Sequence, residues 1–215
     1  MLVEDIMRRS LITIEPEDSI RLALLKIHQH RIRHLPVVSE GKLVGIISDR
    51  DVRDACPSII STPHNEDEKI LDTPVSSIIR KNVITAHPLD FVEEAALALY
   101  DNCIGCLPVV VNGELKGMIT ETDILYTLIE LMGVHHPSSH IELEVEDKAG
   151  LLADVAQIFK EVNCNVTSVL VFPGKQPGKK NLVFRVQTID PRNIVSKIEK
   201  AGYRMIWPRE SEGLL

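Results

Sequence analysis

The hydrophobic and polar positions of this 215-residue chain follow one pattern twice, at a spacing of 72 residues. The apolar run Leu35-Pro36-Val37-Val38 returns as Leu107-Pro108-Val109-Val110, and Ile12-Thr13 returns as Ile84-Thr85. These identities recur without a gap between residues 1–56 and 73–128. Self-similarity at a fixed period is the sequence signature of duplication, so the pattern indicates two copies of one structural unit.

Each copy is predicted to run strand, helix, strand, strand, helix. In the first copy, apolar residues recur at helical spacing over residues 20–27, and two short runs at 35–38 and 43–47 are typical of strands. Tight turns are expected at Glu40-Gly41 and at its counterpart Asn112-Gly113, which is a strong hairpin signal. Second helices are expected over 49–55 and 121–132. Such a small unit cannot bury its apolar face alone, so the copies should pack as a pseudo-symmetric pair.

The pattern changes after the second copy. Alternating apolar residues predict a strand at 140–146, and a helix follows at 151–161. A strand at 166–172, a Pro/Gly-rich hairpin loop at 173–180, a strand at 182–188, a helix at 193–201 and a strand at 203–207 complete the order βαββαβ. We expect an α+β protein of five segments: repeat domain 1–56, linker 57–72, repeat domain 73–132, linker 133–139 and ferredoxin-like domain 140–208.

The composition excludes several classes of function but does not point to a particular one. The net charge of −7 and the pI near 5.6 argue against nucleic acid and anionic membrane as partners. No apolar run approaches the roughly 20 residues that span a bilayer. The N-terminus lacks the layout of a secretory signal, and the four cysteines lack disulfide-framework spacing. We therefore expect a cytoplasmic protein.

The sharpest chemical signal is a motif that each copy carries once. In both Gly45–Asp51 and Gly117–Asp123, a glycine is expected to end a buried strand, a hydroxyl to open a helix and an aspartate to follow three residues later. A carboxylate can accept both hydroxyls of a ribose, with the Ser or Thr hydroxyl adding a third hydrogen bond. The same spacing is also a helix capping box. Its presence at two equivalent places favours the nucleotide interpretation.

These features resemble a pair of CBS domains, a tandem module that typically binds adenosine nucleotides between its copies. The matching residues are Ile12-Thr13, the run His34–Val38 and the two Gly-to-Asp motifs. Residues 140–208, with Asp147-x-x-Gly150-Leu151, resemble an ACT domain, a regulatory unit that often binds amino acids across a dimer interface. A CBS pair followed by an ACT domain is similar to the acetoin-utilisation (AcuB) family.

The resemblance implies a set of nucleotide-binding residues. It places Ser48, Asp51, Thr120 and Asp123 on ribose hydroxyls, Thr13 and Thr85 near the phosphates or ribose, the backbone around Pro36 and Pro108 on adenine, and Arg33, His34 and Arg50 on phosphate. The second copy departs from this pattern, with Gly105, Cys106 and Thr122 at the three cationic positions. We therefore expect unequal pockets, of which the first favours a phosphorylated ligand. For Arg33 the alternative is a solvated basic edge.

The third domain offers a second candidate ligand site. Asp147 and Gly150 precede a helix whose free N–H groups could hold a carboxylate, and Asn163 and Asn165 could bind an amino group. The alternative is that Asp147 is a helix cap and that Gly150 permits tight packing.

Metal and nucleophile chemistry is not expected. Cys103-x-x-Cys106 has zinc or redox spacing, but no second Cys/His pair follows at a suitable distance. His135, His136 and His140 fall in or beside a linker, where a solvated loop is the simpler interpretation. No nucleophile, base and orienting group can be assembled, so we expect neither catalytic residues nor a metal nor a cofactor.

Three functions remain open. The first is a regulatory sensor, in which an adenosyl ligand such as AMP, ADP, ATP or S-adenosylmethionine shifts the two copies relative to each other. The ACT domain would pass this change to a regulated enzyme, which the sequence does not identify. The second is a small enzyme that uses the cleft, and the third is a structural dimerisation module with empty pockets. A homodimer is expected in each case.

Overall fold

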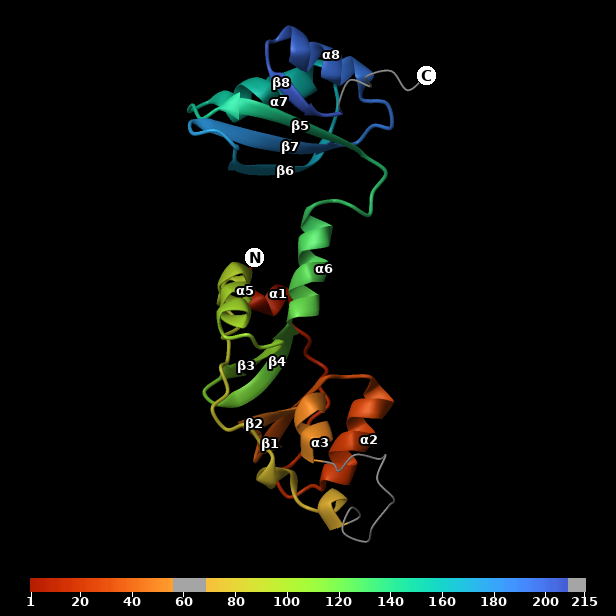
Figure 1. The fold of residues 1–215 in the computed structure, drawn as a ribbon, viewed down its shortest axis with the longest axis vertical. Coiled ribbons are helices and arrows are strands. Elements are labelled where there is room, and N and C mark those ends of the chain that lie inside the picture. Colours follow the sequence, from red (N-terminus) through yellow and green to blue (C-terminus); the bar gives the residue numbers. More distant parts are fainter. Residues whose placement is uncertain (56–68, 209–215) are drawn as a thin grey trace. The chain divides into compact units, whose positions relative to one another are not determined.

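The computed structural model describes residues 1–55 and 69–208 (Figure 1). Most of the predicted linker 57–72 lies outside these residues. The chain divides into two compact units, Met1–Leu125 and Tyr126–Leu215. Mixed helices and antiparallel sheets in both units confirm the α+β class. In the described part of the chain, no helix is both long and apolar enough to cross a membrane.

The first unit contains the two repeats. Its elements are α1 (Val3–Ile6), α2 (Ile20–His30), β1 (His34–Ser39), β2 (Lys42–Ser48), α3 (Asp49–Ala55), the 3-10 turn η1 (Val75–Ser77), α5 (Val92–Asp101), β3 (Cys106–Val111), β4 (Glu114–Thr120) and the start of α6 (Glu121–Leu131). The strands form one sheet in the order β1-β2-β4-β3. The two hairpins meet through β2 and β4 where Lys42 pairs with Glu114.

Both hairpin turns form where the sequence places them. Ser39 pairs with Lys42 and Val111 pairs with Glu114, which leaves two-residue turns at Glu40-Gly41 and Asn112-Gly113. All four turn residues have positive φ, between 50° and 84°. This is the backbone that a twisted two-residue hairpin requires, and it is why glycine stands at the second position.

The two copies exchange their N-terminal arms, which we define as residues 1–9 and 73–81. Val3 and Met7 of the first arm pack into the core of the second copy, with Leu99, Leu107 and other residues. Val75, Ile78 and Ile79 of the second arm pack into the core of the first copy. Each arm also forms a short antiparallel bridge with the strand of the other copy, Arg8 with Met118 and Arg80 with Ile46. Neither core is complete without the other copy's arm.

The glycine of each Gly-to-Asp motif admits the exchanged arm. A methyl group at Gly45 would lie 2.3 Å from the Ile79 side chain and 2.8 Å from the Arg80 carbonyl oxygen. At Gly117 it would lie 2.6 Å from Met7 and 3.0 Å from the Arg8 carbonyl oxygen. These separations are too short for a side chain. The motif glycines therefore allow the backbone of the exchanged arm to lie close to the strand.

The first predicted strand of each copy is reduced to a single bridge. Ile14 forms a single parallel bridge with Val37, and Ala86 forms the equivalent bridge with Val109. The reason is that each segment makes only two hydrogen bonds to its neighbour before the chain turns into the next helix: Ile14 N–H to Pro36 and Val38 N–H to Ile14 in the first copy.

The second unit has the predicted βαββαβ order. Its elements are β5 (Ser139–Glu146), α7 (Leu151–Glu161), β6 (Val166–Pro173), β7 (Lys179–Val186), α8 (Arg192–Lys200) and β8 (Arg204–Trp207), with the sheet order β6-β7-β5-β8. Alternate residues of β5 face the core, as the sequence predicts: Ile141, Leu143 and Val145. They pack against apolar residues of α7 and α8, including Phe159, whose ring lies 4.7 Å from that of Phe184.

The hairpin loop of this unit is tighter than predicted. Pairing between β6 and β7 continues to Pro173 and Lys180, and β7 begins at Lys179 rather than at 182. The charged residues there are favourable in a strand because β5 presents Glu146 opposite Lys179. The last positions of the predicted strand, Gln187 and Thr188, follow the end of β7.

Candidate functional site

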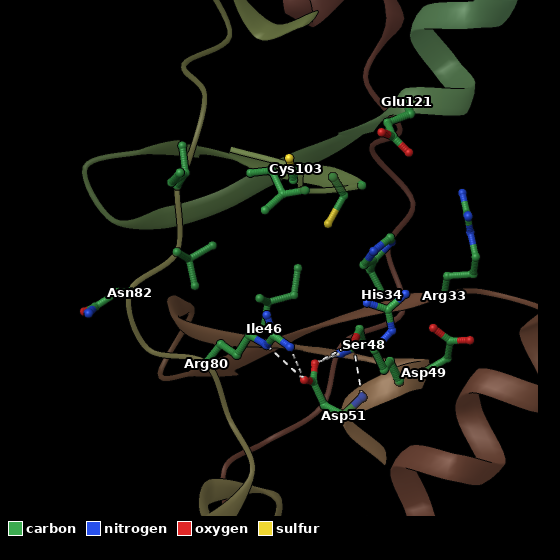
Figure 2. Close-up of a pocket in the computed structure, with 16 residues that line it drawn as sticks. Arg33, His34, Ile46, Ser48, Asp49, Asp51, Arg80, Asn82, Cys103 and Glu121 are labelled. Carbon is green, nitrogen blue, oxygen red and sulfur yellow. Dashed lines mark hydrogen bonds and ion pairs between the residues drawn. The ribbon is translucent and has the colours of Figure 1, made fainter. Parts of the chain in front are cut away.

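A cleft of about 400 Å³ lies between the two copies of the first unit. This is within the range of small-molecule sites. Figure 2 shows its lining. The first copy contributes residues of β2, the start of β1 and the start of α3, and the second copy contributes the end of its arm, the segment 82–84, residues 103–106 and the start of α6. The lining residues are Arg33, His34, Ile46, Ser48, Asp49, Arg50, Asp51, Arg80, Asn82, Val83, Ile84, Cys103, Ile104, Gly105, Cys106 and Glu121.

Ser48 and Asp51 form a helix capping box on the wall of the cleft. The Ser48 backbone N–H and hydroxyl donate to Asp51 Oδ2 at 2.8 and 2.5 Å, and the Asp51 backbone N–H donates to Ser48 Oγ at 3.2 Å. The capping interpretation of the motif is therefore correct. It does not exclude ligand binding, because Asp51 also lines the cleft.

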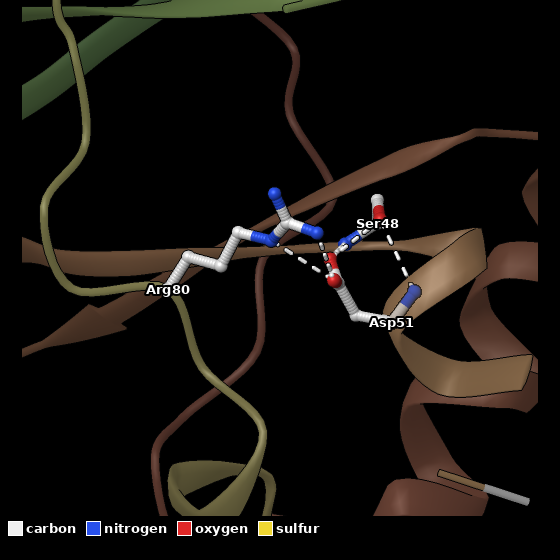
Figure 3. Close-up of polar contacts among 3 residues, drawn as sticks. All are labelled: Ser48, Asp51 and Arg80. Carbon is white, nitrogen blue, oxygen red and sulfur yellow. Dashed lines mark hydrogen bonds and ion pairs between the residues drawn. The ribbon is translucent and has the colours of Figure 1, made fainter. Parts of the chain in front are cut away.

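Arg80 is the second partner of Asp51, and it comes from the exchanged arm. Its Nε and Nη2 donate to Asp51 Oδ1 at 2.9 and 2.6 Å (Figure 3). Burial by itself would raise the pKa of Asp51, but the hydrogen bonds from Ser48 and Arg80 outweigh burial and lower it. Asp51 is therefore held as a carboxylate at neutral pH.

The second copy reproduces this arrangement. Thr120 donates its backbone N–H and its hydroxyl to Asp123 Oδ2 at 3.0 and 2.6 Å. Arg8 of the first arm donates its Nε to Asp123 Oδ1 at 2.8 Å. The two arginines thus hold equivalent places, one on each exchanged arm.

His34 occupies the space that the second copy leaves open at Gly105. A methyl group at Gly105 would lie 3.0 Å from the His34 ring, so a side chain there would displace the imidazole. Burial and the nearby Arg33 lower the pKa of His34, and the carboxylates of Asp49, Glu121 and Asp51 offset this only in part. The imidazole is therefore mostly neutral at pH 7.

Two cations of the cleft have no carboxylate partner among the described residues. Arg33 and Arg50 form no ion pair there, whereas Arg80 is paired with Asp51, and Asp49 is paired with Arg53 at 3.0 Å. Arg33 and Arg50 are both exposed. Unpaired guanidinium groups at the edge of a cleft are suited to bind a phosphate.

The structure brings together five of the predicted nucleotide-binding residues. Arg33, His34, Ser48, Arg50 and Asp51 line the cleft. The others do not line it: Thr13, Thr85, Pro36, Pro108, Thr120 and Asp123. Thr85 directly follows Ile84, which does line the cleft. Pro36 and Pro108 are buried, and their carbonyl oxygens accept the N–H groups of Ile14 and Ala86.

Sequence reasoning missed the contribution of the second arm and of the residues that directly follow it. Arg80, Asn82 and Val83 line the cleft, yet they lie about 30 residues from the motif that they face. The recurrence of Arg8 as Arg80 at the repeat spacing was a usable signal. Repeat spacing alone does not reveal which copy an arm packs against.

The candidate ACT ligand residues fall at opposite ends of α7. Gly150 precedes the helix with φ 88°, and Asp147 contacts Lys180 at 2.6 Å. Asn163 follows the helix with φ 52°, and Asn165 donates to the Gln187 side chain at 3.1 Å. A helix of 11 residues is about 16 Å long, so one small ligand cannot contact both pairs within one chain.

Both cysteines of the Cys103-x-x-Cys106 motif line the cleft. Cys103 is exposed and Cys106 is buried. Burial raises the pKa of the Cys106 thiol to about 12, which keeps it protonated and unreactive at neutral pH.

Comparison with known proteins identifies both parts of the chain. The model of the CBS domain family matches residues 3–58 and 75–130, and the ACT domain model matches residues 139–202. A CBS domain-containing protein of Dictyostelium discoideum is 38% identical over 143 residues, which cover 65% of this chain and 99% of the relative.

Among the solved structures that resemble the CBS pair are the following two. A putative acetoin utilization protein (AcuB) from Vibrio cholerae is 30% identical with a TM-score of 0.54, covering 62% of this chain and 94% of its own. The CBS domain pair of protein MJ0100, solved with 5′-methylthioadenosine and S-adenosyl-L-methionine, is 32% identical with a TM-score of 0.51. That match covers 60% of this chain and 95% of the solved one.

Proposed function

Because this chain belongs to the CBS domain family and carries an ACT domain after its CBS pair, we propose that it is a non-catalytic regulatory protein that binds an adenosine nucleotide between the CBS copies. The observation that carries this proposal is the cleft beside Asp51, where the carboxylate that takes part in the cap of α3 lies among arginines. The adenosyl ligands of the MJ0100 CBS pair support the same ligand class.

Each part of a nucleotide has a suitable partner in the cleft. The Asp51 carboxylate and the Ser48 hydroxyl are the hydrogen-bonding groups that a ribose diol needs. Ile46, Ile84 and Ile104 offer apolar surface to the flat base. Arg33 and Arg50 add positive charge for one or more phosphates.

The two nucleotide positions are proposed to be unequal. Only the position beside Asp51 combines the ribose-type carboxylate with Arg33, His34 and Arg50. At the equivalent places beside Asp123 the chain has Gly105, Cys106 and Thr122. We expect a phosphorylated ligand beside Asp51 and, beside Asp123, a neutral adenosyl group or no ligand.

Regulation requires that the nucleotide prefer one arrangement of the copies over another. The cleft is built from both copies, and the exchanged arms join their cores, so occupancy can bias how the copies pack. We propose that the ACT domain passes this bias to a partner or binds a second small ligand, in a cytoplasmic homodimer.

Calorimetric titration with AMP, ADP, ATP and S-adenosylmethionine tests the ligand class. We expect micromolar or tighter binding of at least one of them. Asp51→Ala should abolish or strongly weaken it, while Asp54→Ala, on the exposed side of the same helix, should leave it unchanged. Absence of binding to all four compounds would favour a structural dimerisation module, and turnover of the bound nucleotide would favour an enzyme.

A role in acetoin utilisation is the finer proposal. It rests on the domain order and on the likeness to the Vibrio cholerae protein, which covers 62% of this chain. Deletion of the coding sequence in its host should impair growth on acetoin and leave growth on glucose unchanged. Equal growth of the two strains on acetoin would contradict the assignment.

A further inference from the structure

The Asp51 carboxylate has no acceptor position left for a ribose. A carboxylate offers about four lone-pair sites. Two donors from Ser48 converge on Oδ2, and two donors from Arg80 converge on Oδ1. A ribose diol that approaches Asp51 must therefore displace one of these two partners.

Arg80 is the partner that can leave. The Ser48 donors belong to the cap of α3, so their removal would expose the helix start. The Arg80 side chain is 63% exposed, whereas that of Asp51 is 11% exposed. An exposed guanidinium regains hydration when it leaves its partner, so this ion pair is the weaker restraint.

The backbone of Arg80 can stay in place while its side chain turns. Its N–H donates to the Ile46 carbonyl and its carbonyl accepts from the Ile46 N–H, both at 3.1 Å. The released guanidinium would remain at the cleft, beside a ligand whose ribose has taken its carboxylate. A phosphate of that ligand is the replacement anion, bound in the geometry that guanidinium groups favour.

We propose, on the basis of the proposed function, that Arg80 is the phosphate-selecting residue of this cleft: it exchanges Asp51 for the phosphate when a nucleotide's ribose takes Asp51. A nucleoside and a nucleotide both have to break the Arg80–Asp51 pair. Only the nucleotide supplies a new anion, its phosphate, to which the released Arg80 side chain can bind. The cleft therefore selects against neutral adenosyl compounds, through a residue that belongs to the arm of the opposite copy.

The test compares AMP with adenosine, which differ only in the phosphate, by calorimetry on the full chain. Wild type should prefer AMP. Arg80→Gln should bind adenosine more tightly, because no ion pair with Asp51 has to be broken. It should lower the ratio of AMP affinity to adenosine affinity by about tenfold or more, the effect of losing one charge-assisted hydrogen bond to the phosphate. Arg80→Lys keeps the positive charge but loses the two parallel N–H donors of the guanidinium, so its ratio of AMP affinity to adenosine affinity should be intermediate. Arg204→Gln is the matched control: Arg204 is 72% exposed and pairs with the 12% exposed Glu144 of the second unit, and neither residue lines the cleft, so this change should leave the ratio unaltered.

The outcomes separate this proposal from the proposed function. If wild type binds neither compound nor any other adenosyl ligand, the proposed function itself is wrong. If wild type binds but Arg80→Gln keeps the preference for AMP, only the role of Arg80 is wrong. The same change of ratio in Arg204→Gln would also overturn it. If Arg80→Gln weakens the binding of AMP and of adenosine equally, Arg80 has a structural role instead. Thermal unfolding of each variant shows whether its fold is retained.

Discussion

At the residue scale, one carboxylate serves two purposes that the sequence presents as alternatives. Asp51 caps α3 and also faces a cleft lined with cations. The Ser-x-x-Asp spacing makes the cap predictable, because both groups are local. The contact with Arg80 was not predictable, because the partner lies 29 residues away and belongs to an arm from the other copy.

His34 should make stability depend on pH below neutrality. Its pKa is lowered in the folded protein, so between its unfolded value near 6.5 and the lower folded value the unfolded chain binds more protons. The free energy of unfolding should therefore fall as the pH drops from 7 to 5. Urea unfolding at several pH values should show a smaller fall in His34→Gln. An identical pH dependence of the two proteins would contradict the burial of a neutral imidazole.

Gly45 should not tolerate a side chain. A methyl group there would lie within 3 Å of both the Ile79 side chain and the Arg80 backbone, so the arm must move. We expect Gly45→Ala to lower the free energy of unfolding by about 1–3 kcal/mol. Gly117→Ala should cost less, because the nearest atom belongs to the flexible Met7 side chain. Chemical denaturation measures both, and equal or negligible effects would contradict the close approach of the arm.

At the element scale, most helices and strands could be predicted, because local periodicity and turn chemistry determine them. The hairpins of the first unit and α3 lie where the pattern placed them, and α7 has the predicted bounds. The exchange of arms could not be predicted. Val3 and Val75 are equivalent apolar residues, and their spacing is compatible with packing in either copy. Only the tertiary fold decides between the two.

The exchange predicts that each arm stabilises the sheet of the other copy. Val3 and Val75 are fully buried, so replacing either with alanine should lower the free energy of unfolding by about 1–3 kcal/mol. Amide hydrogen exchange gives the more specific result. Val3→Ala should reduce protection mainly in β3 and β4, and Val75→Ala mainly in β1 and β2. The reverse pattern would mean that each arm serves its own copy.

At the scale of the whole molecule, the duplication gives one scaffold with two equivalent positions whose surrounding residues differ. The arms, hairpins and capped aspartates are repeated, so both copies keep the same fold and the same Arg–Asp pair. Arg33, His34 and Arg50 of the cleft are not repeated, and Gly105 provides the space that His34 fills. The repeated residues therefore maintain the fold of both copies, while the residues that are not repeated give the two positions different linings.

The second unit presents an edge that favours a homodimer. Among the described strands, β6 lies at one end of its sheet and pairs only with β7. Its side chains Val169, Leu170, Val171 and Phe172 are 37–48% exposed, which places apolar surface beside unpaired backbone groups. Two such edges can pair with each other and bury this surface, so we expect the chain to be a dimer at micromolar concentration.

Val171→Lys tests this edge, because a lysine on an edge strand opposes strand pairing. Light scattering should give the mass of a dimer for wild type and a lower mass for the variant. Ile189→Lys is the matched control: this residue is 90% exposed and lies outside the strands of the same unit, so the dimer should persist. A variant that remains dimeric would place the interface elsewhere, and a monomeric wild type would contradict the homodimer itself.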